Sequence, residues 1–401
     1  MTGQHISRRA ASVPASPIRA LTPLAVETAG RGIKIYHVNI GQPDLPAPRE
    51  ILDAIKAPAD GVIPYAPSGG QPETVRAWCT YYRSVSIDLQ PANLLVTTGG
   101  GEAIGFAMMA VADPGDDILI FDPTYASYLG YAATTNVNLV PIPSVPPDYR
   151  LPDPEIIERA VTARTRAMVL INPGNPTGTV YTREEVQAVI DIASRHGLFV
   201  ISDETYRELV FDDAEHVSVF DFAGCEDLTI VVDSVSKRFS ATGLRVGCIA
   251  SRNRDVMAAA LRMAMARLSG PTVGQLAAVP LLENPGPYTS WLRQEYQRRR
   301  DAACEALRAL PGVSVGQPQG AFYAMASLPV EDASAFARWL LTDFQCNGET
   351  VMVAPGPGFY VTPGLGRHEA RIAYVLGVQP LRRAMELLGQ ALAVYPERLA
   401  A

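Results

Sequence analysis

A lysine that follows an apolar run and precedes an arginine by eight positions has the clearest chemistry in the sequence. Lys237 and Arg245 lie in Asp233-Ser-Val-Ser-Lys-Arg-Phe-Ser-Ala-Thr-Gly-Leu-Arg-Val-Gly247, where small residues surround the lysine. A lysine at the end of a core strand loses its proton readily, because desolvation disfavours the ammonium ion. Imine formation needs a neutral amine of this kind. The segment therefore predicts an imine-forming amine at Lys237.

Three other stretches could contribute to a binding site. Thr97-Thr-Gly-Gly-Gly-Glu-Ala103 opens an apolar helix with three glycines, whose exposed N–H groups and helix dipole favour a phosphate. Asn172-Pro-Gly-Asn-Pro-Thr-Gly178 has two Asn-Pro steps in one turn. Ser202-Asp-Glu-Thr-Tyr206 places an acid and a phenol at the carboxyl end of a strand, the edge where open α/β sheets bind ligands. Each stretch could be structural, but their occurrence together indicates a single site.

Short β-branched runs alternate with helical segments between about residues 99 and 250. We expect strands at 117–121, 167–171, 198–202, 229–232 and 246–250. Strands that are buried on both faces and separated by helices predict a mainly parallel α/β sheet. Thr182-Arg-Glu-Glu185 predicts a capping box for a helix that continues to His196.

The flanking regions have a different pattern. Residues 1–50 are rich in proline and glycine and are expected to form an extended arm. Long helices are expected at about 253–268 and 288–310, followed by a smaller α+β region. The elements expected in that region are strands near 313–315, 321–327 and 371–375 and a helix near 332–346.

Composition excludes several classes of protein. The chain has 401 residues, of which 48% are hydrophobic, so it can bury a large core. Its 34 basic and 41 acidic residues give a net charge of −7, which does not suit a nucleic-acid binder. Five scattered cysteines form no C-x-x-C pair and indicate no metal site, no disulfide framework and a cytoplasmic location. No apolar run suits a membrane span or a signal peptide.

Other catalytic motifs are absent or out of context. The sequence contains neither G-x-G-x-x-G nor G-x-x-x-x-G-K-[ST]. Its one G-x-S-x-G match, at 312–316, is followed by a turn, whereas a nucleophile elbow leads into a helix. We therefore expect Ser314 to be a strand residue. The five histidines have no metal-binding spacing, and we assign no catalytic role to His37, the one histidine close to the other candidate residues.

Taken together, these segments resemble the fold-type I pyridoxal-phosphate aminotransferases of class I/II, which are aspartate aminotransferase-like. The resemblance extends from Asn39-Ile-Gly-Gln-Pro-Asp44 through Pro355-Gly-Pro-Gly-Phe-Tyr360 to Arg371-Ile-Ala-Tyr374. It implies a large domain with a mainly parallel sheet between helices and a smaller α+β domain. The implied boundaries are 1–50 for the N-terminal arm and part of the small domain, 51–287 for the large cofactor-binding domain and 288–401 for the small C-terminal domain.

The resemblance also implies how pyridoxal 5′-phosphate would be held. Lys237 would form the Schiff base and act as general base and acid. Asp203 would keep the pyridine nitrogen protonated, which makes the ring an electron sink. Asn175 and Tyr206 would hydrogen-bond the phenol oxygen, and Tyr125 would stack on the ring. The phosphate would be bound by Gly100, Gly101, Ser234, Ser236 and Arg245.

Residues from other parts of the chain would complete the site that the resemblance implies. Arg371 would clamp the substrate α-carboxylate, with Asn175 and the Gly41 backbone beside it. Tyr65 matches a tyrosine that reaches the phosphate of the neighbouring subunit, which implies a homodimer with shared active sites.

The side-chain pocket departs from some relatives. Gly101 stands where some aspartate-specific relatives have lysine, and Thr205 stands where many have alanine. Arg267 could supply a positive charge to the pocket, or it could hydrogen-bond carbonyls at the end of a helix. The sequence leaves dicarboxylate specificity open.

The leading hypothesis for function is transfer of an amino group between an L-amino acid and a 2-oxo acid by a ping-pong mechanism. An alternative keeps the same residues around the cofactor for β-elimination, decarboxylation or oxidative deamination. A cofactor-sensing regulator would need an added DNA-binding module, and the first 50 residues are too few to provide one.

Overall fold

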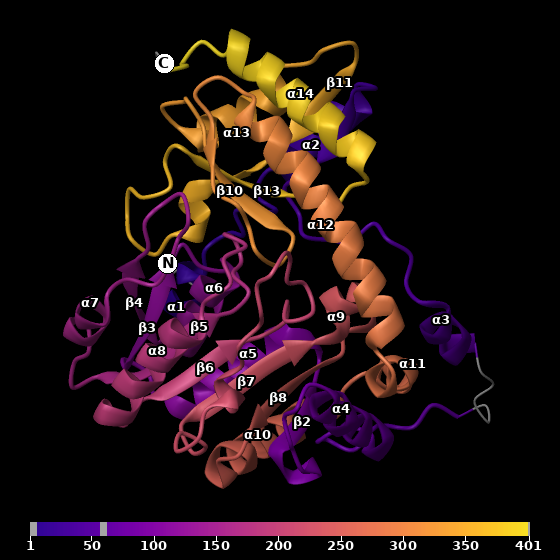
Figure 1. Ribbon diagram of the computed structural model, residues 1–401, viewed down its shortest axis with the longest axis vertical. Helices are drawn as coiled ribbons and strands as arrows, with labels where there is room; N and C mark the ends of the chain where they lie inside the picture. The colour runs from indigo at the N-terminus through magenta and orange to yellow at the C-terminus, as the bar shows by residue number, and fades with distance from the viewer. Residues whose placement is uncertain (1–5, 57–61, 400–401) are drawn as a thin grey trace, which may run out of the picture.

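A seven-stranded sheet lies at the centre of the larger part of the molecule (Figure 1). The computed structural model describes residues 6–56 and 62–399. The strand order is β2 (Leu94–Thr97), β8 (Gly247–Ser251), β7 (Thr229–Ser234), β6 (Phe199–Asp203), β5 (Thr165–Ile171), β3 (Asp117–Asp122) and β4 (Asn138–Pro143). Strand β8 is antiparallel to both its neighbours, and all other neighbouring strands are parallel. The predicted mainly parallel α/β sheet is confirmed.

The five expected strands lie within two residues of their predicted bounds, but β4 was not anticipated. This strand is at the edge of the sheet and contains Pro141 and Pro143. Proline cannot donate to a strand ladder, so it is tolerated at an edge and obscures the strand pattern in the sequence.

Two layers of helices cover the sheet. Helices α5 (Gly99–Val111), α6 (Ser127–Thr135) and α10 (Arg254–Arg267) pack on one face. Helices α4 (Pro72–Ser84), α7 (Pro154–Arg159), α8 (Arg183–His196) and α11 (Thr272–Glu283) pack on the other. Successive residues of β3 alternate between the two layers, as the pleat requires, and both layers are apolar. The predicted capping box of α8 is formed, because Thr182 and Glu185 each accept a hydrogen bond from the other's backbone N–H.

A smaller part of the molecule contains two further sheets. Strands β12 (Ala354–Pro355), β13 (Glu369–Ala373), β10 (Tyr323–Ser327) and β9 (Ser314–Val315) form an antiparallel sheet in that order. Helices α2 (Thr22–Gly30), α12 (Gly286–Arg308), α13 (Ala333–Thr342) and α14 (Val378–Val394) share one core with it. Helix α12 runs from this part towards the large sheet (Figure 1). Ser314 is a strand residue, as expected.

The N-terminal region is more helical than the expected extended arm. It contains α1 (Arg8–Ser12), α2 and α3 (Arg49–Lys56). Pro23 lies in the first turn of α2, where its missing N–H costs no helical hydrogen bond, so proline content alone was misleading. Strand β1 (Lys34–His37) pairs in parallel with β11 (Glu349–Met352) and joins the smaller part.

The domain boundaries 1–50, 51–287 and 288–401 stay a prediction. Within the described residues, every helix is too short or too polar to cross a membrane.

Candidate active site

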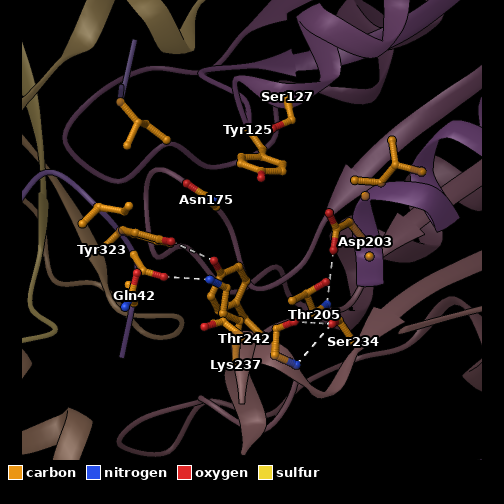
Figure 2. A pocket seen from close by; sticks show the side chains of 18 of the residues that line it. Gln42, Tyr125, Ser127, Asn175, Asp203, Thr205, Ser234, Lys237, Thr242 and Tyr323 are labelled. Atoms are coloured by element: carbon orange, nitrogen blue, oxygen red, sulfur yellow. Dashed lines mark hydrogen bonds between the residues drawn. The ribbon is translucent and has the colours of Figure 1, made fainter. Parts of the chain in front are cut away.

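A cavity of about 570 Å³ lies where strands β5, β6 and β7 end. Its lining includes twelve of the thirteen residues that the sequence analysis assigned to the site: Gly41, Gly100, Gly101, Tyr125, Asn175, Asp203, Tyr206, Ser234, Ser236, Lys237, Arg245 and Arg371. The carboxyl ends of parallel strands meet at one sheet edge, which is why segments far apart in sequence converge here. Figure 2 shows Lys237 between Asp203 on one side and Tyr323 on the other.

Lys237 is carried by α9 (Val235–Arg238), a single helical turn that directly follows β7. Ser234 caps this turn by accepting a hydrogen bond from the Ser236 N–H at 3.1 Å. Arg238 anchors it through a fully buried ion pair with Asp233. A buried pair of this kind makes the position of the turn depend on both partners, because either charge alone would be uncompensated.

The amine of Lys237 is poised to lose its proton. Desolvation lowers the pKa of Lys237 to about 8, and the positive charges of Arg371 and Arg245 act in the same direction. Its Nζ donates a hydrogen bond to the Gly41 carbonyl at 2.7 Å. A substantial fraction of the amine is therefore neutral near pH 8, as a nucleophile or base requires.

Asp203 is a buried carboxyl group at the carboxyl end of β6. It is 5% exposed, and burial raises its pKa to about 6. The Thr205 N–H donates to it at 3.2 Å, and among the residues the structure describes no basic side chain forms an ion pair with it. Burying an unpaired carboxylate is costly, so this position suits a ligand that brings its own positive charge. The protonated ring nitrogen of pyridoxal phosphate has that property.

The glycine-rich start of α5 forms a cradle for an anion. A Cβ at Gly99 would lie 2.5 Å from Arg245 Nη2, and a Cβ at Gly247 would lie 2.8 Å from the Gly100 nitrogen. A side chain at Gly99 would therefore collide with the Arg245 guanidinium, and one at Gly247 would collide with the backbone at the start of α5. Ser234 and Ser236 are joined by a 2.8 Å hydrogen bond between their hydroxyls at the same cavity. Backbone N–H groups, hydroxyls and a guanidinium together fit a phosphate.

Arg371, on strand β13 of the smaller part of the molecule, places a buried positive charge at the cavity. It is fully buried, donates to Asn175 Oδ1 at 3.0 Å and to the Asn39 carbonyl at 2.6 Å, and has no hydrogen-bond partner for Nε. The rings of Tyr323 and Phe359 lie on it, with centroids 4.3 and 4.7 Å from the guanidinium carbon. Within the described residues no carboxylate forms an ion pair with it. A buried guanidinium with a free N–H fits a carboxylate ligand.

Tyr323 is a cavity residue that the sequence analysis missed. Its hydroxyl is 2.8 Å from that of Tyr206, and a Cβ at Gly41 would lie 1.8 Å from it. Burial raises the pKa of both phenols, so both stay neutral. The sequence carries no signal for this role, because Tyr323 looks like any aromatic residue of a core strand. The contact explains why position 41 is glycine.

Two predicted features lie outside the cavity. Tyr65 is 77% exposed on the surface of its own chain. Arg267 lies 3.5 Å from Glu102 Oε1 and donates to the Ser68 and Val96 carbonyls at 3.1 and 3.4 Å. These carbonyls belong to a turn and to strand β2 rather than to the end of a helix, so within residues 6–56 and 62–399 the arginine contacts neither the cavity nor the helix-end carbonyls that the sequence analysis considered.

Comparison with known proteins finds relatives that match almost the whole chain. The model of the family described as aminotransferase class I and II matches residues 33–388. A probable aspartate/prephenate aminotransferase of Thermus aquaticus is 30% identical over 395 residues, which cover 96% of this chain and 99% of that protein. The structure of Thermus thermophilus aspartate aminotransferase with maleate has a TM-score of 0.88 and 30% identity, covering 97% of this chain and 100% of the other. An N-succinyldiaminopimelate aminotransferase from Mycobacterium tuberculosis also has a TM-score of 0.88, at 28% identity, covering 97% of this chain and 100% of that one.

Proposed function

Because the chain belongs to the aminotransferase class I and II family, we infer that the cavity around Lys237 is where its cofactor and substrates react. The protein is an enzyme that transfers an amino group between an amino acid and a 2-oxo acid with pyridoxal 5′-phosphate. The alternative of elimination, decarboxylation or oxidative deamination is not favoured, since these relatives are named as aminotransferases. One observation carries the site assignment: an amine with a lowered pKa shares a cavity with a buried carboxyl group and a buried guanidinium, neither of which forms an ion pair within the part of the chain that the structure describes.

When bound, pyridoxal phosphate supplies the carbonyl that accepts the amino group and a ring that withdraws electrons from the substrate α-carbon. In our proposal Asp203 stabilises the positive ring nitrogen, because burial strengthens the attraction between the two charges. Gly100, Gly101, Ser234, Ser236 and Arg245 bind the phosphate. Tyr125 lies against the ring.

Lys237 then moves the proton of the reaction in this proposal. Its neutral amine would take the proton from the substrate α-carbon and give it to C4′, the cofactor carbon that carries the aldehyde in the free cofactor. Arg371 and Asn175 hold the substrate carboxylate, so that the Cα–H bond rather than the bond to the carboxylate faces the ring system. Tyr206 donates a hydrogen bond at the phenol oxygen, and Tyr323 fixes the orientation of Tyr206 through the bond between their hydroxyls. This arrangement supports Cα–H cleavage and hence transamination.

The function predicts a reaction that stops halfway without an acceptor. Holoenzyme mixed with an L-amino acid alone should lose its visible cofactor absorption and release one 2-oxo acid per active site. Adding a second 2-oxo acid should restore the absorption, which stopped-flow spectroscopy and product analysis would follow. Sustained release of ammonia, carbon dioxide or a thiol without any acceptor would contradict transamination.

The lowered pKa of Lys237 predicts how the empty enzyme takes up its cofactor. Only the neutral amine can attack the cofactor aldehyde, so the rate of covalent attachment should rise with pH through about 8 and level off above it. An ordinary lysine would give a rise centred near 10.5. Absorbance changes after mixing apoprotein with pyridoxal phosphate would measure this rate, with Lys237→Ala as the variant that shows no attachment. A rate still rising steeply above pH 9.5 would contradict the assignment.

We further propose a homodimer with shared active sites. Three neighbouring side chains of one segment, Val62, Ile63 and Tyr65, are 72, 67 and 77% exposed. The segment lies beside residues 268–272, because Thr272 donates to the Pro64 carbonyl at 2.9 Å. Leu268 in that neighbouring stretch is also 51% exposed. An exposed apolar surface of this kind favours a protein interface. In the dimer Tyr65 would reach the phosphate group held by the partner subunit.

The free cysteines support a cytoplasmic location.

A further inference from the structure

A second cavity of about 370 Å³ adjoins the active-site cavity, between the N-terminal segment 13–18 and helix α6. The two cavities share three lining residues, Ser16, Ile18 and Ser127, so they meet at that wall. We call the second cavity the annex. Figure 2 shows Ser127 beside Tyr125 at the edge of the main cavity.

The segment that forms the outer wall of the annex is held in place. Pro17 lies so close to Gly358 that a Cβ at Gly358 would be 2.1 Å from the Pro17 Cβ. Asn39 donates to the Ile18 carbonyl at 3.1 Å. Gly358 belongs to the short 3-10 helix η4 (Gly356–Phe359), whose last residue, Phe359, packs on Arg371. The shared wall is therefore tied to the same elements that hold the carboxylate-binding arginine.

The annex offers apolar surface and no charge. Its lining includes Val13, Pro14, Ala126, Leu129 and Tyr131, and among the described residues that line it none is charged at neutral pH. The Tyr131 hydroxyl lies where a side chain at position 101 would begin, 2.5 Å from a Cβ placed at Gly101. Burial raises the pKa of Tyr131 to about 12, so the phenol is neutral. A carboxylate in the annex would lose its hydration without gaining a cation.

We propose that the annex binds the side chain of the substrate, and that this side chain is long and apolar or aromatic. This inference rests on the proposed function of the main cavity. The main cavity must hold the cofactor as well as the substrate α-carbon and carboxylate, whereas the annex adds room within the size range of ligand pockets. A side chain that extends past Ile18 and Ser127 leaves water for an apolar surface that is already formed. Arg19 lines the main cavity but not the annex, so an acidic side chain would be held at Arg19 and leave the annex empty.

Gly130 allows a direct test. It lines the annex from within α6, and a Cβ added there has no atom within 4 Å. Gly130→Phe should therefore add a ring to the lining of the annex from a position where the first side-chain atom meets no neighbour, and replacing glycine inside a helix removes an unfavourable residue. Gly130→Ala is the matched control, because it makes the same backbone change and leaves the annex open.

The experiment measures binding of unreactive straight-chain carboxylates, from butyrate to octanoate, to the holoenzyme by calorimetry. In the parent and in Gly130→Ala, affinity should rise about fourfold for each methylene that enters the annex. In Gly130→Phe the gain should disappear, while butyrate binds as in the parent. Transamination of phenylalanine should fall more than tenfold in Gly130→Phe, while that of alanine stays unchanged.

Two results would overturn the proposal. One is an affinity for octanoate that Gly130→Phe leaves unchanged. The other is an affinity of the parent that stops rising after butyrate, because the added methylenes would then find no apolar surface. If the parent transaminates no amino acid, the proposed function fails, and the carboxylate series still shows separately whether the annex binds apolar chains.

Discussion

Replacing Lys237 by alanine should reduce transamination by about 10⁴-fold, the upper end of what a positioned general base contributes. The variant loses both the amine that attaches the cofactor and the group that moves the α-proton. It should remain folded, because the buried Arg238–Asp233 pair still anchors α9 and the desolvated amine itself contributes little to stability. It should also keep some affinity for pyridoxal phosphate through the phosphate-binding residues. Steady-state kinetics and equilibrium dialysis would measure the two effects.

The small number of lysines makes this prediction sharp. The chain has three, Lys34, Lys56 and Lys237. Lys34 is exposed and pairs with Glu349 on the surface, so Lys34→Ala is a matched control that should retain full activity. Borohydride reduction of the parent followed by mass spectrometry should place the cofactor on Lys237. An adduct on either of the other two lysines would refute the assignment, and sedimentation should give the same assembly for parent and variant.

Replacing Arg371 by alanine should weaken substrate binding by about 2–5 kcal/mol, or roughly 30- to 5,000-fold. This is the scale for removing one partner from a buried, hydrogen-bonded charge pair, since the substrate carboxylate would be left without its cation. Arg371→Lys should recover only part of the loss, because an ammonium group cannot offer the planar pair of N–H donors. The dissociation constant of an unreactive carboxylate and the kcat/KM of an amino acid would measure both changes.

A simple primary amine separates this role from a structural one. Such a substrate has no carboxylate, so its slow reaction with the cofactor should change far less in Arg371→Ala than that of an amino acid. Arg371 also donates to Asn175 and to the Asn39 carbonyl, so thermal unfolding should accompany the kinetics. Equal losses for amines and amino acids would mean that Arg371 only holds these segments together.

Local signals in the sequence were sufficient for the class of fold and most of the site. Lys237 and Asp203 come directly after or at the end of apolar runs, and Gly100 opens a helix after another. The ends of neighbouring strands in a parallel sheet meet at one edge, so linear order already implies that these groups lie together. The family resemblance added Arg371 and Gly41, and the cavity contains both.

Only the tertiary structure decided which groups face one another across the two parts of the molecule. Arg371 contacts Asn175 and the Asn39 carbonyl over separations of 196 and 332 residues. Tyr323 at Gly41, Arg267 at Glu102 and Pro17 at Gly358 are likewise contacts between distant segments. No spacing rule encodes such contacts, because they depend on how side chains of separate elements fill the space between them. The roles of Tyr323 and Arg267, and the annex beside the cavity, therefore emerge only from packing.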